Sequence, residues 1–426
     1  MTKKLFQKYF TDSFFLNAPL VINTAVALVI LPIIITNLPI ADYGKWQFVL
    51  ALQAWLIGFS GSNITLASKR GIVRRLGGTF FYAFLARLKL LILIGLIIIS
   101  TAGILKFLGY LTFSILLVII GLYLIFGYLF QISFYEFLIA KKKFRKWCFW
   151  QILFSFVSMV GSAIVACLTK NIVFFALFQL GSITILSWIG WFWIVKKEKL
   201  IEGYKKGEVD EECVLYGLKL ILVDLVSMTA GKISHLIIGP FFGFSNLAIF
   251  SIANKLRDKC AGVMKSVRLL LYADFAKKER KELIKIINRY LVKIGILGLV
   301  LSLTFLVAGW FYIIFFLPEA FHQATIYLTV LLLGLPAGMM AIVLHAVLES
   351  HLRYKELTVL GIVPNLLKIV LILIFGYFWK IIGICFALAI SGWISFGFYY
   401  FLTLKREVVI KFINDYPKLK RFIQKY

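Results

Sequence analysis

Charged side chains are scarce in this chain of 426 residues. They make up 15% of the sequence, against about 25% in ordinary soluble domains, whereas hydrophobic residues make up 62% and aromatic residues 16%. A soluble fold of this size cannot bury that much apolar surface, and a disordered chain would be far more polar. A transmembrane barrel is excluded as well, because its strands alternate apolar and polar residues and the apolar runs here are continuous. The composition therefore predicts an all-α polytopic membrane protein.

Residue types that hold metals or perform covalent chemistry are also few. The five cysteines show no metal or disulfide spacing and are interpreted as small buried hydrophobes, and the four histidines form no metal constellation. No Ser-His-Asp set, phosphate-binding loop or pair of carboxylates is evident. We therefore expect neither a metal nor another cofactor, and we do not expect an enzyme. No cleavable signal peptide is expected, because the first 16 residues are basic and amphipathic without a cleavage site.

Twelve segments are long and apolar enough to span a membrane, which requires about 20 residues each. Each is identified by the residue near its centre. The centres are Val26, Leu56, Ile97, Leu122, Met159, Ile185, Met228, Asn254, Leu303, Leu332, Leu371 and Phe396.

Positive charge is distributed unequally between the two sides of these spans. The net charge is +28, from 47 Lys and Arg against 19 Asp and Glu. If the N-terminus is cytoplasmic, 35 of the 47 basic residues, Arg87 among them, fall in the tails and inner connections. Only four, Lys45, Lys106, Lys170 and Lys380, fall in outer connections. This is the positive-inside pattern. It predicts a multi-pass protein of the cytoplasmic (inner) membrane with both termini in the cytoplasm, and it removes the need for a nucleic-acid partner.

Six spans that return to the same side allow two halves in one orientation. We therefore expect an N-terminal six-helix bundle over residues 1–195, a cytoplasmic linker over 196–213, a C-terminal six-helix bundle over 214–404 and a basic cytoplasmic tail over 405–426. The turns at 40–48 and 242–250 resemble each other weakly, since each places a polar turn and a small residue before an apolar helix.

The segment 31–44, LPIIITNLPIADYG, resembles the opening hairpin of polysaccharide and O-antigen flippases. These belong to the multidrug/oligosaccharidyl-lipid/polysaccharide exporter superfamily. In that family an apolar helix leads to a Leu-Gly-x-x-(Asp/Glu)-Tyr-Gly turn, and a second helix ends in small residues before a cytoplasmic arginine. Here Leu-Pro replaces Leu-Gly, and 58–65, GFSGSNIT, precedes Lys69 and Arg70. The resemblance implies two six-helix bundles arranged as a V, a central cavity that opens alternately to each side, and a lipid-linked oligosaccharide on a polyprenyl diphosphate as cargo.

Polar residues form one-sided stripes on two spans of the second half. Span seven carries Asp224, Ser227, Lys232 and His235 within a sector of about 140°. Span eight places its polar residues at i, i+3, i+4 and i+7, a spacing that predicts one helix face. Such faces should meet another helix or a water-filled cavity rather than lipid. The residues of the second stripe are Ser251, Asn254, Lys255 and Asp258.

Two lysines lie near mid-bilayer, where an ionisable group is costly and usually functional. Lys368 follows Asn365 by about one turn, and Lys255 belongs to the stripe of span eight. Either they bind an anionic cargo, or they pair with Asp224 or Asp258 and hold helices together. The predicted substrate-binding set is Lys255, Lys368, Asn365, Asn254, Lys232, His235, Asn23 and Gln53, of which Asn23 and Gln53 could equally bridge helices.

Asp224 and Asp258 are predicted to be coupling or structural residues. A carboxylate at the depth of Asp224 can neutralise a basic neighbour, such as Lys255, or bind and release H⁺ or Na⁺ during a transport cycle.

These observations predict a flippase that moves a polyprenyl-diphosphate-linked oligosaccharide, such as an O-antigen or another surface polysaccharide repeat unit, across the cytoplasmic membrane by alternating access. Its partners would be this lipid, the bilayer and polysaccharide polymerase or chain-length machinery. The alternatives are an ion-coupled multidrug exporter of the same superfamily, whose cationic drugs favour carboxylates, and a membrane polysaccharide polymerase. The short outer connections argue against the polymerase, since such enzymes generally need a substantial extracytoplasmic loop.

Overall fold

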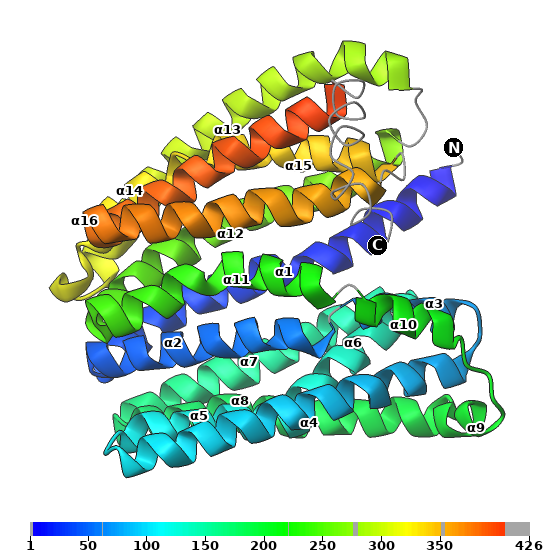
Figure 1. Ribbon diagram of the computed structural model, residues 1–426, viewed down its shortest axis with the longest axis horizontal. Helices are drawn as coiled ribbons and strands as arrows, with labels where there is room; N and C mark the ends of the chain where they lie inside the picture. The colour runs from blue at the N-terminus through cyan, green and yellow to red at the C-terminus, as the bar shows by residue number, and fades with distance from the viewer. Residues whose placement is uncertain (1–2, 62, 220, 276–279, 351–353, 405–426) are drawn as a thin grey trace, which may run out of the picture. The chain divides into compact units, whose positions relative to one another are not determined.

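The computed structural model describes residues 3–61, 63–219, 221–275, 280–350 and 354–404, and within these ranges the chain forms helices and turns without a β-strand (Figure 1). The predicted tail, 405–426, lies outside the described residues. Tertiary contacts divide the chain into two compact units, Met1–Met228 and Thr229–Tyr426. The division falls inside one helix, beyond the predicted linker 196–213, and the domain boundaries drawn from the sequence stay a prediction.

The first unit holds most of the helices of the chain. They are α1 (Lys3–Asn37), α2 (Ile40–Ile57), the 3₁₀ turn η1 (Gly58–Ser60), α3 (Ile64–Val73), α4 (Gly77–Phe107), α5 (Leu111–Tyr123), the π-helical turn η2 (Leu124–Tyr128), α6 (Leu129–Ala140), α7 (Phe144–Thr169), α8 (Ile172–Lys197), α9 (Leu200–Lys205), α10 (Glu211–Lys219) and the first half of α11 (Ile221–Ile237).

The second unit contains the rest of α11 and the following elements. They are the π-helical turn η3 (Ile238–Phe242), α12 (Phe244–Phe275), α13 (Arg280–Phe316), η4 (Glu319–Phe321), α14 (Ala324–Leu332), α15 (Leu335–Ser350) and α16 (Tyr354–Leu404).

Among the residues that the structure describes, eight helical segments are long and apolar enough to cross a membrane, and the bent pair Glu319–Leu332 and Leu335–Leu348 makes a ninth. The segment Thr358–Thr403 has 46 residues, twice what one crossing needs. It is interrupted at Trp379 and Lys380, whose backbone is not helical, so it forms two spans. With α2 and α12, the described residues contain twelve long helical segments. The predicted fold class, an all-α polytopic membrane protein with about twelve spans, is confirmed; the V shape and central cavity stay predictions.

Aromatic stacking holds the core of the first unit together. α1 packs on α7, α4 packs on α5, and α8 packs on both α6 and α7. Between α4 and α8, Phe84 and Trp191 stack with ring centroids 4.1 Å apart, and Phe80 also stacks with Trp191, at 5.6 Å. Such pairs add about 0.5–1.5 kcal/mol beyond the burial of their surfaces, and they fix α4 beside α8.

Small residues bring the helices of the second unit close together. α15 packs against α12, α13 and α16, and α14 packs against α12 and α16. A Cβ at Gly298 of α13 would lie 2.8 Å from the Cα of Pro336, and one at Gly334 would lie 2.7 Å from the Cα of Ala389. Helices in lipid associate through such close backbone approach rather than through the hydrophobic effect.

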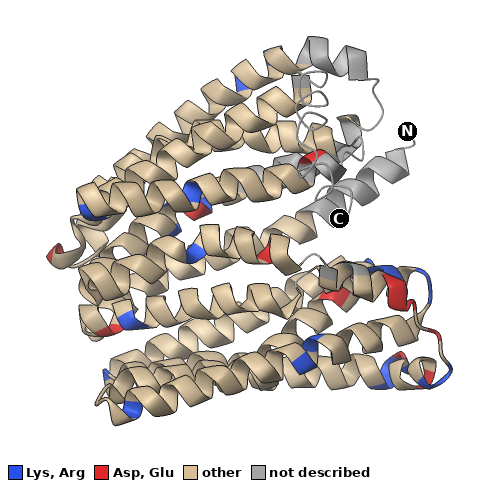
Figure 2. Ribbon diagram, in the orientation of Figure 1, with Lys and Arg blue, Asp and Glu red and all other residues tan. Residues whose placement is uncertain are grey.

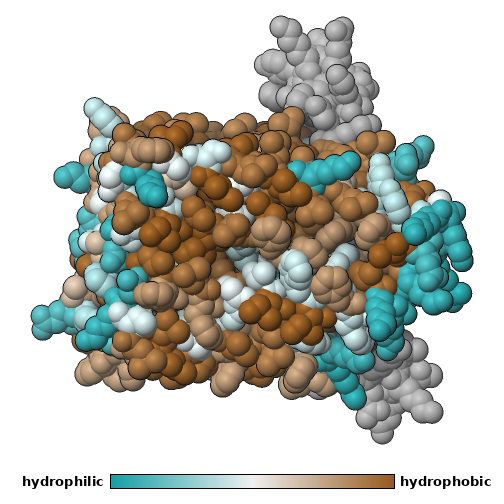
Figure 3. All heavy atoms as spheres, turned by 90° about the horizontal axis from the view of Figure 1, so that it is seen from below, coloured by the Kyte–Doolittle hydropathy of each residue, from teal (hydrophilic) through white to brown (hydrophobic). Residues whose placement is uncertain are grey.

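Charge gathers at one end of the first unit. Figure 2 shows Lys, Arg, Asp and Glu concentrated around α3, α9 and α10, whereas the long helices of the first unit carry few charges along their middle. The face drawn in Figure 3 is hydrophobic across its middle and hydrophilic towards its two ends. This is the pattern of helices that cross an apolar layer with their ends in water.

Candidate functional site

A cluster of basic residues lies within the second unit, on α11, α12 and α16. Arg257 and Asp258 form an ion pair on α12, with Nη2 and Oδ1 2.6 Å apart. The charges of Arg257, Asp258 and Lys232 all act on Lys368 of α16, and those of Asp258, Lys255 and Arg257 act on Lys232 of α11. Three helices therefore bring four cations around the carboxylate of Asp258.

The polar stripe of span eight lies on one face of α12, as the spacing indicates. Asn254 donates from Nδ2 to Oδ2 of Asp258, one turn further on, over 3.2 Å. Ser251 is fully buried, while Lys255 and Asp258 are exposed. The stripe thus runs from the interior of the unit to its surface, and its exposed end carries the charge.

Lys232 and Lys368 are partly buried, and neither forms an ion pair within the described part of the chain. Asn365 lies one turn from Lys368, and its Nδ2 donates to the Gly361 carbonyl over 2.7 Å. His235 is buried, with its ring against Phe250 at 5.2 Å and its Nδ1 3.4 Å from the hydroxyl of Ser234. Of the predicted second-half residues, His235 is therefore the one held most completely by packing.

Arg257 belongs to this cluster although the predicted set omits it. Lys255 and Asp258 belong to the polar stripe of α12, whereas Arg257 lies next to that stripe on the helix surface. Its long side chain nevertheless reaches the carboxylate of Asp258. The depth of the residue in an apolar segment is the signal that could have identified it.

The predicted residues of the first half, Asn23 and Gln53, belong to the other unit. Asn23 is partly buried on α1, and Gln53 is partly buried on α2 with Oε1 enclosed and lacking a partner among the described residues. An enclosed amide oxygen without a donor costs about 1–3 kcal/mol. Of these two amides, Gln53 therefore carries the larger energetic cost among the described residues.

Asp224 binds Asn63, the residue just before α3, through both carboxylate oxygens. Its Oδ2 accepts the backbone N–H of Asn63 at 3.1 Å, and its Oδ1 accepts the side-chain Nδ2 of the same residue at 2.8 Å. Gly61, whose φ is +69°, lies shortly before α3, which begins at Ile64. A carboxylate at a helix N-terminus is stabilised by the unpaired N–H groups there, so Asp224 holds the start of α3.

A buried ion pair inside the first unit was not predicted from the sequence. The charge pattern groups Arg87 with the second inner connection, but the structure places it within α4, with Nη1 3.1 Å from Oε1 of Glu136 on α6. The two side chains are 2% and 3% exposed. Arg87 Nε and Glu136 Oε2 are enclosed without partners among the described residues. Glu136 is the only acid in the sequence of Leu111–Ala140, and that isolation could have revealed the pair.

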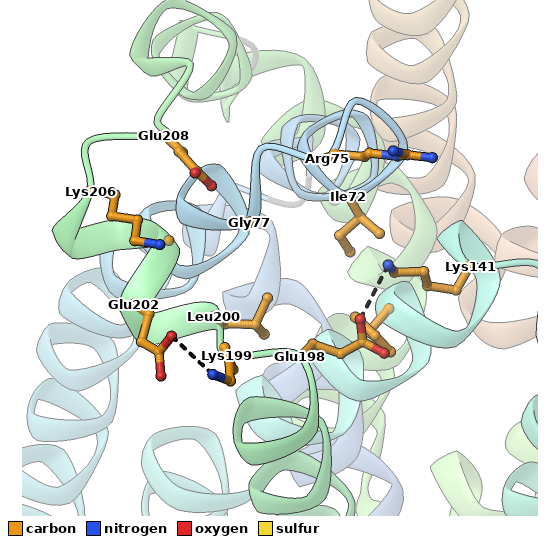
Figure 4. A pocket seen from close by; sticks show the side chains of 12 residues that line it. Ile72, Arg75, Gly77, Lys141, Glu198, Lys199, Leu200, Glu202, Lys206 and Glu208 are labelled. Carbon is orange, nitrogen blue, oxygen red and sulfur yellow. Dashed lines mark ion pairs between the residues drawn. The ribbon is translucent and has the colours of Figure 1, made fainter.

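At the charged end of the first unit, a pocket of about 380 Å³ opens between α3, α4, α6 and the segment around α9 (Figure 4). Side chains that line it pair with one another: Lys141 lies 3.2 Å from the Glu198 carboxylate, and Lys199 lies 3.6 Å from Glu202. Lys143, which is not part of the lining, lies 3.4 Å from the same Glu198 carboxylate. Burial alone would raise the pKa of Glu198, but hydrogen bonds and charge from Lys141 and Lys143 outweigh it and hold that pKa below its usual range.

These features define a multi-pass membrane protein with the fold of known transporters. A structure described as the inward-facing conformation of a multidrug resistance MATE family transporter of the MOP superfamily is 14% identical; the match covers 91% of this chain and 95% of that one, with a TM-score of 0.69. The Vibrio cholerae MATE transporter VcmN in its bent form is 12% identical, with 93% and 96% covered and a TM-score of 0.61. The MATE multidrug transporter DinF-BH is 14% identical, with 92% and 94% covered and a TM-score of 0.60.

The chain belongs to the polysaccharide biosynthesis protein family, whose model matches residues 10–265. A comparison with curated proteins gives no match. The resemblance to the exporter superfamily predicted from residues 31–44 is confirmed by the family and by the fold.

Proposed function

We propose that this protein is a flippase that moves a polyprenyl-diphosphate-linked oligosaccharide, such as an O-antigen or another surface polysaccharide repeat unit, across the cytoplasmic membrane. The observation that carries the proposal is the cation cluster of the second unit, in a chain of the polysaccharide biosynthesis family. Transport of this kind moves the cargo without making or breaking a covalent bond, so the protein needs no catalytic group.

The charge of the cluster matches the part of the cargo that is most difficult to move. A diphosphate carries about two negative charges, and it must find cations when it leaves water. Lys232, Lys255 and Lys368 offer three ammonium groups beside the Arg257–Asp258 pair. Lysines in an apolar segment are costly, and an anionic ligand would offset that cost.

The remaining parts of the cargo have simpler requirements. Sugar hydroxyls need donors and acceptors, and the amides of Asn254, Asn365, Asn23 and Gln53 would supply them during passage. The lipid chain would stay in the hydrocarbon. In this scheme the protein lies in the inner membrane with both termini in the cytoplasm, and it delivers its cargo to polysaccharide polymerase and chain-length machinery.

Alanine substitutions of two deep lysines test the proposal. In cells that depend on this protein, Lys255→Ala and Lys368→Ala should reduce surface glycan while leaving membrane protein at parental abundance, and arginine at either position should retain part of the activity because the charge survives. Lys106→Ala, at the exposed end of α4, is the matched control and should export normally. Parental export by both alanine variants would exclude the cationic site.

An ion-coupled multidrug exporter is the second candidate, because the similar solved structures include multidrug transporters. That function would rely on Asp224 or Asp258 to bind H⁺ or Na⁺ and a cationic drug. In the second unit the described cluster has more lysines than carboxylates, which favours an anion. Drug accumulation in cells with and without the protein separates the two: a drug-specific, ion-dependent decrease with unchanged surface glycan would support the exporter. A polymerase is less well supported, because the described outer turns, such as 108–110 between α4 and α5, are short.

A further inference from the structure

An apolar groove of about 490 Å³ lies on the second unit, and none of the residues of the cation cluster lines it. It runs along α13 and is completed by α15 and α16. Its lining residues on α13 span Asn288 to Leu299, which is about 16 Å of helix at 1.5 Å per residue. The groove is lined by Asn288, Leu291, Val292, Gly295, Ile296, Leu299, Pro336, Met340, Trp393, Phe396 and Tyr400.

One side of the groove consists of side chains that face outward from the bundle. Val292, Ile296 and Leu299 are 63%, 57% and 55% exposed, in a segment that is long and apolar enough to cross the membrane. The opposite side is fixed, because the indole Nε1 of Trp393 donates to the Leu333 carbonyl over 3.1 Å. The groove is therefore open to the hydrocarbon and is shaped before any ligand arrives.

A glycine creates part of the groove. A Cβ at Gly295 would lie 3.2 Å from the sulfur of Met340, so any side chain at this position would enter the space between α13 and α15. Three residues further on, Gly298 allows the close contact with Pro336 that keeps these two helices together.

One end of the groove is polar and positively charged. Asn288 lines it, and two cations that are not among the lining residues are exposed nearby on α13: Arg289 next to Asn288, and Lys293 about one turn further along. Arg289 precedes Ile296 by two helical turns, so both lie along the same side of the helix. From the charge asymmetry of the sequence we expect this end of α13 to face the cytoplasm, where a lipid carrying a phosphate group would present its negative charge.

We propose that this groove binds the isoprenoid chain of the polyprenyl-diphosphate carrier while the diphosphate is still at the cytoplasmic surface, with Arg289 and Lys293 beside it, before the diphosphate passes to the cation cluster. An apolar channel open to lipid accepts the chain, and two cations at its cytoplasmic end complement the anion. The proposal rests on the proposed function and deepens it, because it assigns the tail of the cargo a place on the protein instead of leaving it free in the bilayer.

Photocrosslinking from within the groove tests the proposal directly. The full chain, carrying benzoylphenylalanine in place of Ile296, is reconstituted in phospholipid nanodiscs that contain undecaprenyl diphosphate. The matched control carries the same group in place of Leu303, which is 63% exposed on α13 but does not line the groove. We expect saturable crosslinking to undecaprenyl diphosphate at position 296 and crosslinking to phospholipid alone at 303. Equal labelling at both positions, or loss of the signal when phosphatidylglycerol is added, would show an ordinary bilayer lipid and overturn the proposal.

Filling the groove provides a second, independent measurement. Gly295→Leu should weaken undecaprenyl diphosphate binding about tenfold, because the new side chain occupies the space of the ligand's buried carbons. Gly103→Leu, on α4 of the first unit, is the control, since its Cβ would meet no atom within 4 Å. If Gly295→Leu does not fold, Tyr400→Ala, at the rim of the groove, is used as the groove variant instead. Unchanged binding in a folded groove variant would refute the site. Because these readouts measure binding, they remain interpretable even if the lysine variants show that the protein does not export glycan.

Discussion

Removing one partner of the Arg87–Glu136 ion pair should destabilise the first unit more than the loss of any exposed charge pair in it. The two groups are 3.1 Å apart and almost completely enclosed by α4, α6 and their aromatic neighbours. In Arg87→Met the carboxylate loses its cation and stays in an apolar interior. In Glu136→Gln the guanidinium keeps a hydrogen-bond acceptor but loses the opposite charge, so the second variant should be the milder one.

The expected size of the effect follows from this geometry. Unit charges 3.1 Å apart attract each other by ~5 kcal/mol at an effective dielectric constant of about 20. Breaking buried ion pairs typically costs about 3–5 kcal/mol. We therefore expect Arg87→Met to lower the free energy of unfolding by about 4 kcal/mol and Glu136→Gln by about 3 kcal/mol. Replacing both residues with Met should recover most of the loss, since no charge is then left without a partner.

The measurement is unfolding of the purified protein by SDS in mixed micelles, followed through tryptophan fluorescence. Asp42→Asn is the matched control: it breaks the Lys45–Asp42 pair, which is as short, at 2.8 Å, but has side chains 30% and 27% exposed. An exposed pair of this kind contributes no more than about 1 kcal/mol. If Arg87→Met proved no more destabilising than Asp42→Asn, or if the double variant were worse than both single ones, the reasoning from burial would be refuted.

Three further predictions use features of the same unit. Cys167, exposed near the end of α7 that is predicted to face outward, should react with a membrane-impermeant maleimide in intact cells, whereas a cysteine introduced at Lys206 should react only after permeabilisation; the reverse result would invert the predicted topology. Asp224→Asn should cost about 1–3 kcal/mol, and its combination with Asn63→Ala should cost less than the sum of the two changes, because both remove one interaction; full additivity would contradict the contact. The pKa of Glu198 is lowered in the folded protein, so its ion pairs stabilise the fold fully above the unfolded pKa of this carboxylate and lose that contribution as the pH falls through the folded pKa. The thermal stability of Glu198→Gln should therefore depend less on acid pH than that of the parent. Parallel curves of stability against pH would exclude this role.

The spans could be predicted from the sequence because each is a long local pattern, and the polar stripe of α12 because its spacing follows the helical period. The partners of the charged residues could not. Asn63 and Asp224 are 161 positions apart, and Arg87 and Glu136 are 49 positions apart. No periodicity relates such residues, since packing of separate helices decides which side chains meet. Arg87 illustrates the difficulty: basic residues near a span end normally point to the cytoplasm, and only the facing acid on α6 shows that this one is structural.

Local structure accounts for some of the few positive charges at the turns that are predicted to face outward. Lys170, between the fifth and sixth spans, and Lys380, between the eleventh and twelfth, both have left-handed φ values, 50° and 51°. Lys170 follows a helix end directly, where a cation can interact with the last carbonyl groups. Lys45 is neutralised by Asp42. Lys45 therefore has its partner within α2, and Lys170 lies at the C-terminal end of α7. If these turns face outward, as the charge pattern predicts, Lys45 adds no net charge to that side, and glycine at Lys170 and Lys380 should relieve the backbone strain and increase the charge asymmetry that sets the orientation.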